Sequence, residues 1–232
     1  QSWSAPAAVH QNAATDAGSD ARPRIQMIPD GVAMVVWESS ETMGGILGDD
    51  FDILLARSNT GGQSWLPVAA MNGNALGGGQ SDRWADIDVD DQGNWIVVWR
   101  SEDNLDGQVG YDPDILFSRS TDIGTSWSDP APVNTTAVND WGVNDTRPRI
   151  ASGHDGQWVV VWKSDGPFDE SLGTDFDVVY SVSADGGLNW SAPTALDPGQ
   201  TSDTGQDMAP VAASGLGSAW IAVWSTTDNP AA

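Results

Sequence analysis

Cysteine is absent from the 232-residue sequence, which also has only one lysine, Lys163, and only four glutamates. The lack of cysteine excludes a disulfide scaffold. The sequence has nine basic and 33 acidic side chains, and its net charge of -24 excludes a surface that binds the phosphates of nucleic acid. No apolar run approaches the roughly 18 residues of a membrane-spanning helix, and no basic and apolar signal segment opens the sequence. We therefore expect a soluble chain that is mature or excised from a longer protein.

Turn-forming residues are abundant instead, with 26 glycines, 13 prolines and, once the four glutamates are subtracted from 33 acids, 29 aspartates. No apolar pattern of helical period runs for three turns. The segments WIVVW (95–99) and WVVVW (158–162) are short and rich in β-branched and aromatic residues, which predicts strands buried on both faces. Alternation over 51–58 places Ile53 and Leu55 opposite Leu54 and Ala56. The sequence predicts an all-β fold.

Tryptophan recurs at a nearly constant spacing. One series has steps of 62, 63 and 62 positions and comprises Trp37, Trp99, Trp162 and Trp224. A second has steps of 62, 62 and 63 and comprises Trp3, Trp65, Trp127 and Trp190. Each unit holds four predicted strands, enough for one blade of a β-propeller. We predict one repeat domain over 1–232, with units 1–62, 63–124, 125–187 and an incomplete 188–232, forming about four blades of four antiparallel strands.

An octapeptide repeats with the same period, as SNTGGQSW (58–65), STDIGTSW (120–127) and SADGGLNW (183–190). It is expected in the turn between the third and fourth strands. Its Asp accepts hydrogen bonds from backbone N–H groups of the turn, its Gly adopts a positive φ, and its Trp packs the hairpin end between sheets. We therefore predict a structural role for Ser58, Thr60, Gly62, Trp65, Ser120, Asp122, Gly124, Trp127, Ser183, Asp185, Gly187 and Trp190.

The pattern Ser-x-Asp-x-Gly-x-x-Trp in the second and third octapeptides resembles the Asp-box of sialidase-type (neuraminidase-like) β-propellers, also called the BNR repeat. The first octapeptide departs from it, because Thr60 stands where Asp is expected. The resemblance implies a propeller with Asp-box turns. It also implies more blades than this chain supplies, so we expect further blades or another copy of the chain to complete the ring.

Long loops are expected on the face opposite these turns, where binding sites usually lie. Arginines begin the predicted inner strands there. The sialidase resemblance implies that they bind a substrate carboxylate, although the Arg-Ile pairs lack the family's following Pro. The alternative is internal ion pairing, with Asp52, Asp114 and Asp177 as partners. The arginines concerned are Arg22, Arg24, Arg83, Arg147 and Arg149.

No catalytic nucleophile can be assigned. Sialidases use a Tyr activated by a Glu, and this chain has only Tyr111, in a loop, and Tyr180, at a packing position. Trp84 and Trp141 break the repeat, so they are either sugar-stacking platforms or packing residues. Tyr111 is the third aromatic candidate on this face. His10 and His154 are isolated, as expected of solvated turn residues.

Paired aspartates precede each predicted third strand. Two acids at i and i+2 face the same side of a strand, and hard oxygen ligands at this density favour Ca²⁺. The alternative is solvated turn acids. The pairs are Asp50 with Asp52, Asp112 with Asp114, and Asp175 with Asp177.

Two functions remain open. The first is a non-catalytic module of an exported bacterial protein, which binds a glycan or a neighbouring protein or acts as a spacer. The second is a sialidase-like glycoside hydrolase whose other catalytic residues lie in blades outside this segment. The near-identical repeats and the missing nucleophile favour the first. We expect a secreted or cell-surface (bacterial extracellular or periplasmic) protein with no nucleic-acid partner and no membrane insertion.

Overall fold

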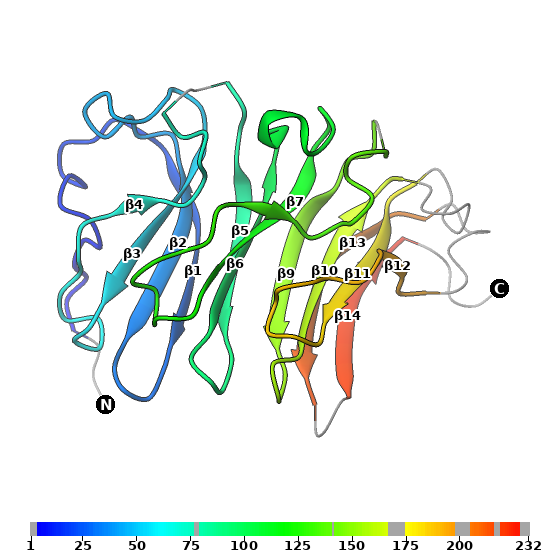
Figure 1. Ribbon diagram of the computed structural model, residues 1–232. Helices are drawn as coiled ribbons and strands as arrows, with labels where there is room; N and C mark the ends of the chain where they lie inside the picture. The colour runs from blue at the N-terminus through cyan, green and yellow to red at the C-terminus, as the bar shows by residue number, and fades with distance from the viewer. Residues whose placement is uncertain are drawn as a thin grey trace.

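The computed structural model describes residues 4–76, 79–140, 142–166, 175–197, 205–215 and 219–227, which form four consecutive antiparallel sheets (Figure 1). The first contains β1 (Asp20–Met27), β2 (Ala33–Ser39), β3 (Asp52–Ser58) and β4 (Ala69–Ala70). The second contains β5 (Arg83–Val89), β6 (Trp95–Ser101), β7 (Asp114–Ser120) and β8 (Ala131–Pro132). The third contains β9 (Thr146–Ser152), β10 (Trp158–Ser164), β11 (Asp177–Ser183) and β12 (Thr194–Ala195). The last contains β13 (Asp207–Ser214) and β14 (Trp220–Thr226).

The predicted all-β class is confirmed. In the described part of the chain the only helical element is a short 3₁₀ turn, η1 (Leu105–Gly107). None of the described residues forms a helix long and apolar enough to cross a membrane. Strand order within each sheet follows the chain, because every strand pairs with its sequence neighbour.

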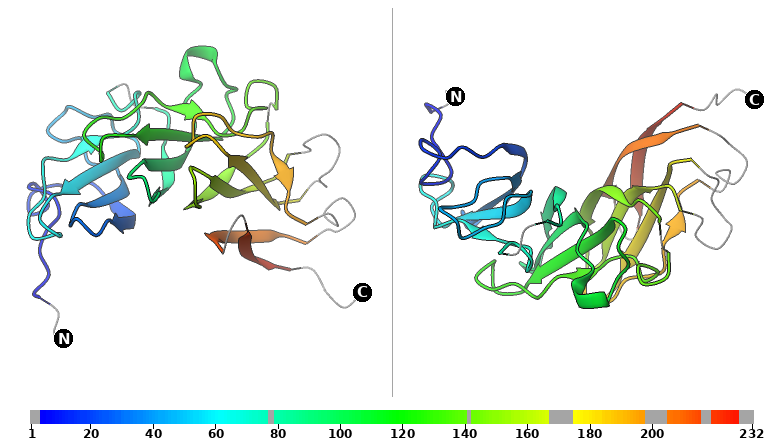
Figure 2. Two further views of the ribbon diagram at one scale, coloured as in Figure 1. Left: turned by 60° about the horizontal axis from the view of Figure 1, so that its bottom comes forward. Right: turned by 90° about the horizontal axis from the view of Figure 1, so that it is seen from above.

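The sheets stand side by side in an arc (Figure 2). β5 contacts both β1 and β9, and β9 contacts β13, so the first strand of each sheet lies nearest the common axis. β4, β8 and β12 pair with the third strands and form the outer edges. This arrangement brings the starts of four inner strands together.

The second strand of each complete sheet is the hydrophobic centre. All five apolar side chains of β6 are fully buried: Trp95, Val97 and Trp99 pack against the first sheet, whereas Ile96 and Val98 pack against the third. Burial on both faces explains why this strand does not alternate with polar residues. The predicted alternation in β3 is also confirmed, since Ile53 and Leu55 face the second sheet and Leu54 and Ala56 face away from it.

The octapeptides lie in the turns that follow β3, β7 and β11. Asp122 Oδ1 accepts hydrogen bonds from Thr125 N (3.0 Å) and Ser126 N (2.9 Å), and Ser120 Oγ accepts one from Gly124 N (2.8 Å). Hydrogen bonds, first of all from the side chain of Ser126, hold the pKa of Asp122 well below its usual range. In the third turn a bond from the Asn189 side chain is the largest of the effects that lower the pKa of Asp185 to about 2.

The first turn forms without an aspartate. Thr60 Oγ1 accepts a hydrogen bond from Ser64 N (2.9 Å), and Ser58 Oγ accepts one from Gly62 N (2.9 Å). The turn glycines also allow close packing between sheets. Gly187 has φ +80°, and a Cβ there would lie 2.2 Å from Ile96 Cδ1 of the second sheet. Trp65, Trp127 and Trp190 each pack against a hydrophobic cluster.

Ile96 and Ile221 occupy equivalent repeat positions but differ in burial. Ile96 is fully buried between two sheets, whereas Ile221 on β14 is 63% exposed. We predict that Ile96→Ala lowers the free energy of unfolding by about 2–5 kcal/mol, because it leaves a cavity. The matched Ile221→Ala variant should cost no more than about 1 kcal/mol. Urea unfolding followed by tryptophan fluorescence measures both. A comparable loss for Ile221→Ala would mean that another surface covers β14 in solution.

Candidate functional site

Each inner strand carries a β-bulge near its start, which shifts the pairing with the second strand. One residue in each bulge has a positive φ, and these residues are repeat equivalents: Arg22 (53°), Trp84 (61°), Arg147 (56°) and Ala209 (52°). Large side chains rarely adopt this conformation, and it is concentrated at functional sites. The bulges therefore mark the axial end of the arc as the candidate site.

The bulges bring together three predicted residues from three different sheets. The guanidinium carbon of Arg22 lies 3.7 Å from the ring centroid of Trp84, and that of Arg147 lies 4.7 Å from it. Both distances fall within the range of cation–π attraction. Trp84 therefore packs against two arginines and positions both.

Glu38 completes this cluster, and sequence reasoning missed it. Its side chain is 1% exposed, forms an ion pair with Arg22 Nη1, and accepts a hydrogen bond from Trp84 N at 3.0 Å. The equivalent positions in the other repeats hold Arg100, Lys163 and Ser225. Glu38 is an acid at a repeat position that elsewhere holds a base or a serine, and this change of charge was the signal that could have identified it.

Arg147 and Lys163 are neighbouring cations without a close acid. Among the described residues no carboxylate oxygen lies within 4.0 Å of either one. Lys163 is buried, and its Nζ lies 3.5 Å from the ring centroid of Phe176. Burial, and then repulsion by Arg147, lower the pKa of Lys163, while Asp165 acts in the opposite direction. An anion placed here would be attracted by both side chains.

The other predicted arginines contact groups of the protein itself. Arg24 Nε lies 3.5 Å from Asp86 Oδ1, and Arg149 also interacts with Asp86, which is buried. Internal ion pairing is therefore correct for this pair, but the predicted partners Asp52, Asp114 and Asp177 were wrong, since the bulge directs both arginines to Asp86. Arg83 instead lies over the ring of Phe51, at 3.8 Å.

None of the remaining aromatic and histidine candidates among the described residues joins the cluster. Tyr111 is 76% exposed, Tyr180 packs against the third and fourth sheets, and Trp141 lies outside the described residues. The prediction for His10 was wrong: its side chain is 13% exposed, stacks on Trp37 and lies 3.3 Å from Asp20. His154 is exposed, as predicted.

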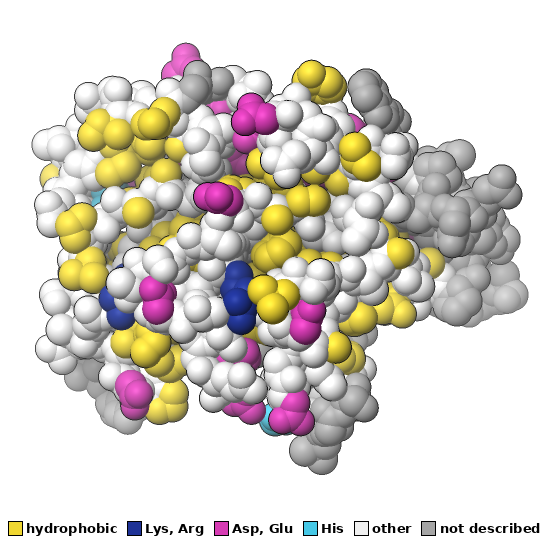
Figure 3. Space-filling view, viewed as in Figure 1, with side chains coloured by type: hydrophobic (Ala, Val, Ile, Leu, Met, Phe, Trp, Pro, Cys, Tyr) yellow, Lys and Arg dark blue, Asp and Glu magenta, His cyan; other side chains and the backbone are white. Residues whose placement is uncertain are grey.

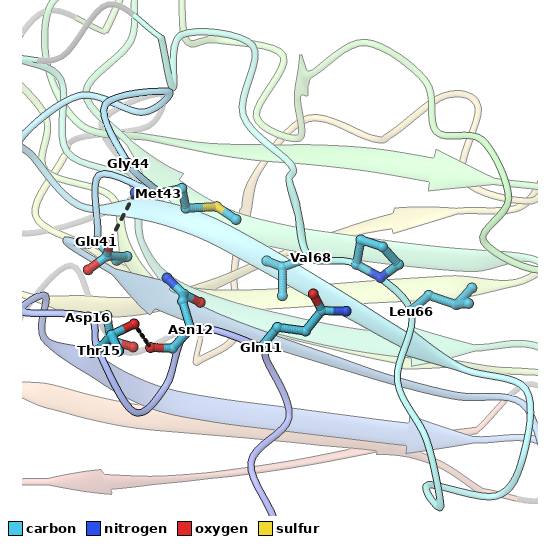
Figure 4. Close-up of a pocket in the computed structure, with 10 residues that line it drawn as sticks. Gln11, Asn12, Thr15, Asp16, Glu41, Met43, Gly44, Leu66 and Val68 are labelled. Atoms are coloured by element: carbon cyan, nitrogen blue, oxygen red, sulfur yellow. Dashed lines mark hydrogen bonds between the residues drawn. The ribbon is translucent and has the colours of Figure 1, made fainter.

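Basic groups are scarce on the surface as a whole. On the face drawn in Figure 3 they occupy small isolated areas, while acidic side chains are spread between apolar patches. A pocket of about 500 Å³ lies beside the first sheet, between the N-terminal segment and the loop after β2 (Figure 4). Asp16, Glu41 and Met43 line it, and Glu41 Oε1 accepts a hydrogen bond from Met43 N. None of the residues predicted for binding is in its lining.

The predicted metal acids form two buried polar clusters instead of exposed turns. In the first, Asn72 Nδ2 donates to Asp52 Oδ1 (2.7 Å) and Asp82 Oδ2 (3.0 Å). In the second, Asn134 Nδ2 donates to Asp114, Asp140 and Asp145. Asp50 and Asp112 lie near the respective clusters and raise the pKa of Asp52 and Asp114. Asp175 is half-buried and Asp177 is buried. Among the described residues, the acids Asp114, Asp140 and Asp145 of the second cluster lie close enough together to hold a metal, as do His10, Asp16 and Asp20 beside the first sheet.

Burial raises the pKa of several of these carboxyl groups. Desolvation raises the pKa of Asp82 to about 8, of Asp114 to about 7 and of Asp52 to about 6. It also raises the pKa of Asp145 well above its ordinary value. Between pH 4 and these values the folded protein holds protons that the unfolded chain has released.

We predict that stability in a chelator-containing buffer falls as the pH rises from 5 to 8, because those protons are lost from the folded state. Asp82 alone, with its pKa of about 8, should lower Tm by roughly 8–16 °C over these three pH units, given about 1.4 kcal/mol per unit and about 2–4 °C per kcal/mol. Asp82→Asn should flatten the profile, whereas the exposed control Asp129→Asn should not. A Tm that rises over this interval would contradict the raised pKa values.

Comparisons with known proteins support the fold. No protein-family model matches the sequence, and no curated protein matches it significantly. Among the solved structures that resemble it, a Hadza microbial sialidase is 18% identical with a TM-score of 0.52, and the match covers 72% of this chain and 36% of that one. A Fusarium graminearum α-L-arabinofuranosidase in complex with arabinobiose is 14% identical with a TM-score of 0.54, and the match covers 90% of this chain and 65% of that one. A Dyadobacter fermentans protein of unknown function is 16% identical with a TM-score of 0.62, and the match covers 90% of this chain and 63% of that one. The chain thus spans about one third to two thirds of their length. At these identities the likeness shows the fold alone, a β-propeller fold like that of the sialidase and the arabinofuranosidase.

Proposed function

We propose that this chain is a non-catalytic sialidase-like Asp-box propeller module that binds a carboxylate-bearing saccharide between Arg147 and Lys163. The observation that carries the proposal is the adjacency of these two cations, neither with a close acid among the described residues, in a chain of net charge -24. Where acids outnumber bases so strongly, a pair of cations without acids needs another partner, and an anionic ligand supplies one.

The chemistry of the two side chains suits a sugar acid. A guanidinium group can form two parallel hydrogen bonds to one carboxylate, and an ammonium group adds a point charge. Arg147 is held by Trp84, and Lys163 by Phe176, so both cations are positioned before a ligand arrives. Preorganisation of this kind reduces the entropy lost on binding.

The negative charge of the whole chain limits this attraction. Repulsion slows the approach of anionic ligands, and salt screens it. Moderate affinity that is retained in physiological salt is therefore expected. A multivalent glycan on a surface outside the cell would fit such a site, in keeping with a secreted or cell-surface bacterial protein.

The inferred absence of catalysis rests on the acids near the site. Glu38 is bound to Arg22 and Trp84, and Asp86 lies between Arg24 and Arg149, so both carboxylates already have partners. The exposed Tyr111 is not part of this cluster, and no described Tyr–Glu pair takes the role of a sialidase nucleophile. The second candidate is a glycoside hydrolase completed by further blades or another copy, which the names of the sialidase and the arabinofuranosidase favour.

Arg147→Gln should weaken binding of a sialic-acid-terminated oligosaccharide about 10- to 100-fold, because a hydrogen bond to a charged group contributes about 1.5–3 kcal/mol. Lys163→Gln should weaken it less. Isothermal titration measures both effects. The control Arg119→Gln makes the same change of charge beside the octapeptide turns and should bind as the parent does. Equal binding of the same oligosaccharide without its acidic sugar would contradict the proposal.

Product analysis separates the two candidate functions. The same oligosaccharide, incubated with the chain, should remain intact if the module only binds. Release of free sialic acid that is lost in Arg147→Gln would instead establish the hydrolase. Both assays are run with calcium and with chelator, because Asp145, one of the acids that could hold a metal, lies two residues before Arg147.

A further inference from the structure

The second acidic cluster lies at the junction between two sheets. Asp114 begins β7, Asn134 follows β8, and Asp145 immediately precedes β9. Asp140 belongs to the loop between β8 and β9, and Asp112 lies just before β7. The cluster therefore joins the second sheet to the inner strand of the third.

The ligand atoms already have the spacing of a small coordination sphere. One carboxylate oxygen each from Asp114, Asp140 and Asp145 lies within 4.8 Å of the others. Ca²⁺ binds oxygen at about 2.3–2.6 Å, so ligands on opposite sides of the ion are separated by up to about 5 Å. Three carboxylates can therefore contact one ion without a change of fold.

Buried oxygen atoms without partners point to a missing ligand. Asp114 is 1% exposed and Asn134 is fully buried, yet Asp114 Oδ2 and Asn134 Oδ1 have no hydrogen-bond partner among the described residues. Oδ1 atoms of Asp112 and Asp140 also lack one. The amide of Asn134 is shared among three carboxylates at 3.0–3.2 Å, although it has only two hydrogens. Buried acceptors without a hydrogen bond lower the stability of the fold unless a further donor or a cation contacts them.

The first cluster is the internal comparison. There Asn72 Oδ1 accepts a hydrogen bond from Ile53 N at 3.1 Å, and Asp82 Oδ1 accepts one from Trp99 Nε1 at 2.8 Å. The sequence has glycines at 77–79 in the corresponding loop and no equivalent of Asp140. Among the described residues, Asp50 Oδ1 and Asp52 Oδ2 lack partners in the first cluster as well. The two clusters therefore differ in the amide oxygen, which is paired only in the first, and in the additional acid Asp140 of the second.

We propose that the second cluster binds one Ca²⁺ through Asp114, Asp140, Asp145 and, after rotation of its amide, Asn134 Oδ1. Rotation costs Oδ1 no bond, because that atom has no partner here, and the three bonds that Nδ2 gives up are replaced by contacts of the carboxylates with the ion. Asp112 contributes charge and an additional oxygen. Ca²⁺ suits the site better than Mg²⁺, since Mg²⁺ requires near-octahedral geometry and retains several waters. The ion fixes the loop from Asn134 to Asp145 against β7.

Calcium titration of the 232-residue chain tests the site. Calorimetry should give one ion per chain, and Tm should rise by roughly 5–10 °C at about one hundred times Kd. Asp140→Asn should reduce the affinity about tenfold or more, and Asp140→Gly, which reproduces the first repeat, should abolish the shift in Tm. The exposed control Asp129→Asn should behave as the parent does.

Two results would overturn this assignment. One is no heat and no shift in Tm with calcium up to roughly 10 mM, well above the Kd of weak extracellular calcium modules. The other is calcium binding that is unchanged in both Asp140 variants, which would place the ion elsewhere. The comparison of calcium with chelator on the parent chain decides the first outcome even if a variant fails to fold.

Discussion

In the first two sheets a hydrogen bond joins a tryptophan of the second strand to an aspartate at the start of the inner strand, and their part of the arc depends on this contact. Trp37 Nε1 donates to Asp20 Oδ1 at 3.0 Å, and Trp99 Nε1 makes the equivalent bond to Asp82. Asp82 also accepts from Asn72 of the preceding sheet. One buried carboxyl group therefore orients its own sheet and attaches it to the previous one. In both sheets the left-handed bulge follows two residues after this aspartate, so the contact sets where Arg22 and Trp84 project.

The fold could be predicted because its main signals are local and repeat along the chain. Two tryptophan series gave the period, and the alternation around Ile53 and Leu54 assigned the faces of β3 correctly. Such patterns depend only on the period of a strand and on which side is buried. A turn with several hydrogen bonds can likewise be recognised in eight residues, and Thr60 shows that a hydroxyl group can replace the carboxylate there.

The site could be predicted only in part, because its contacts join strands of different sheets. The sequence identified the arginines, but it paired Arg24 and Arg149 with the recurring Asp52 series when their partner is Asp86. A bulge inserts one residue into the pairing and redirects every side chain around it, and no composition signal marks it. Glu38 was missed for a related reason. In the sequence it is a single acid on a buried strand, and its role becomes clear only from its contact with Arg22 on the neighbouring strand.

The proposed calcium site and the proposed anion site share one stretch of chain. Asp145 lies in the acidic cluster, and Arg147 follows two residues later in the bulge of β9. A cation among the four acids would neutralise repulsion that otherwise opposes the loop from Asn134 to Asp145. It would also strengthen the attachment of β9 to the second sheet, where Trp84 contacts Arg147. Charge balanced inside the junction would leave Arg147 and Lys163, which have no carboxylate oxygen within 4.0 Å among the described residues, available to an anion at the axis.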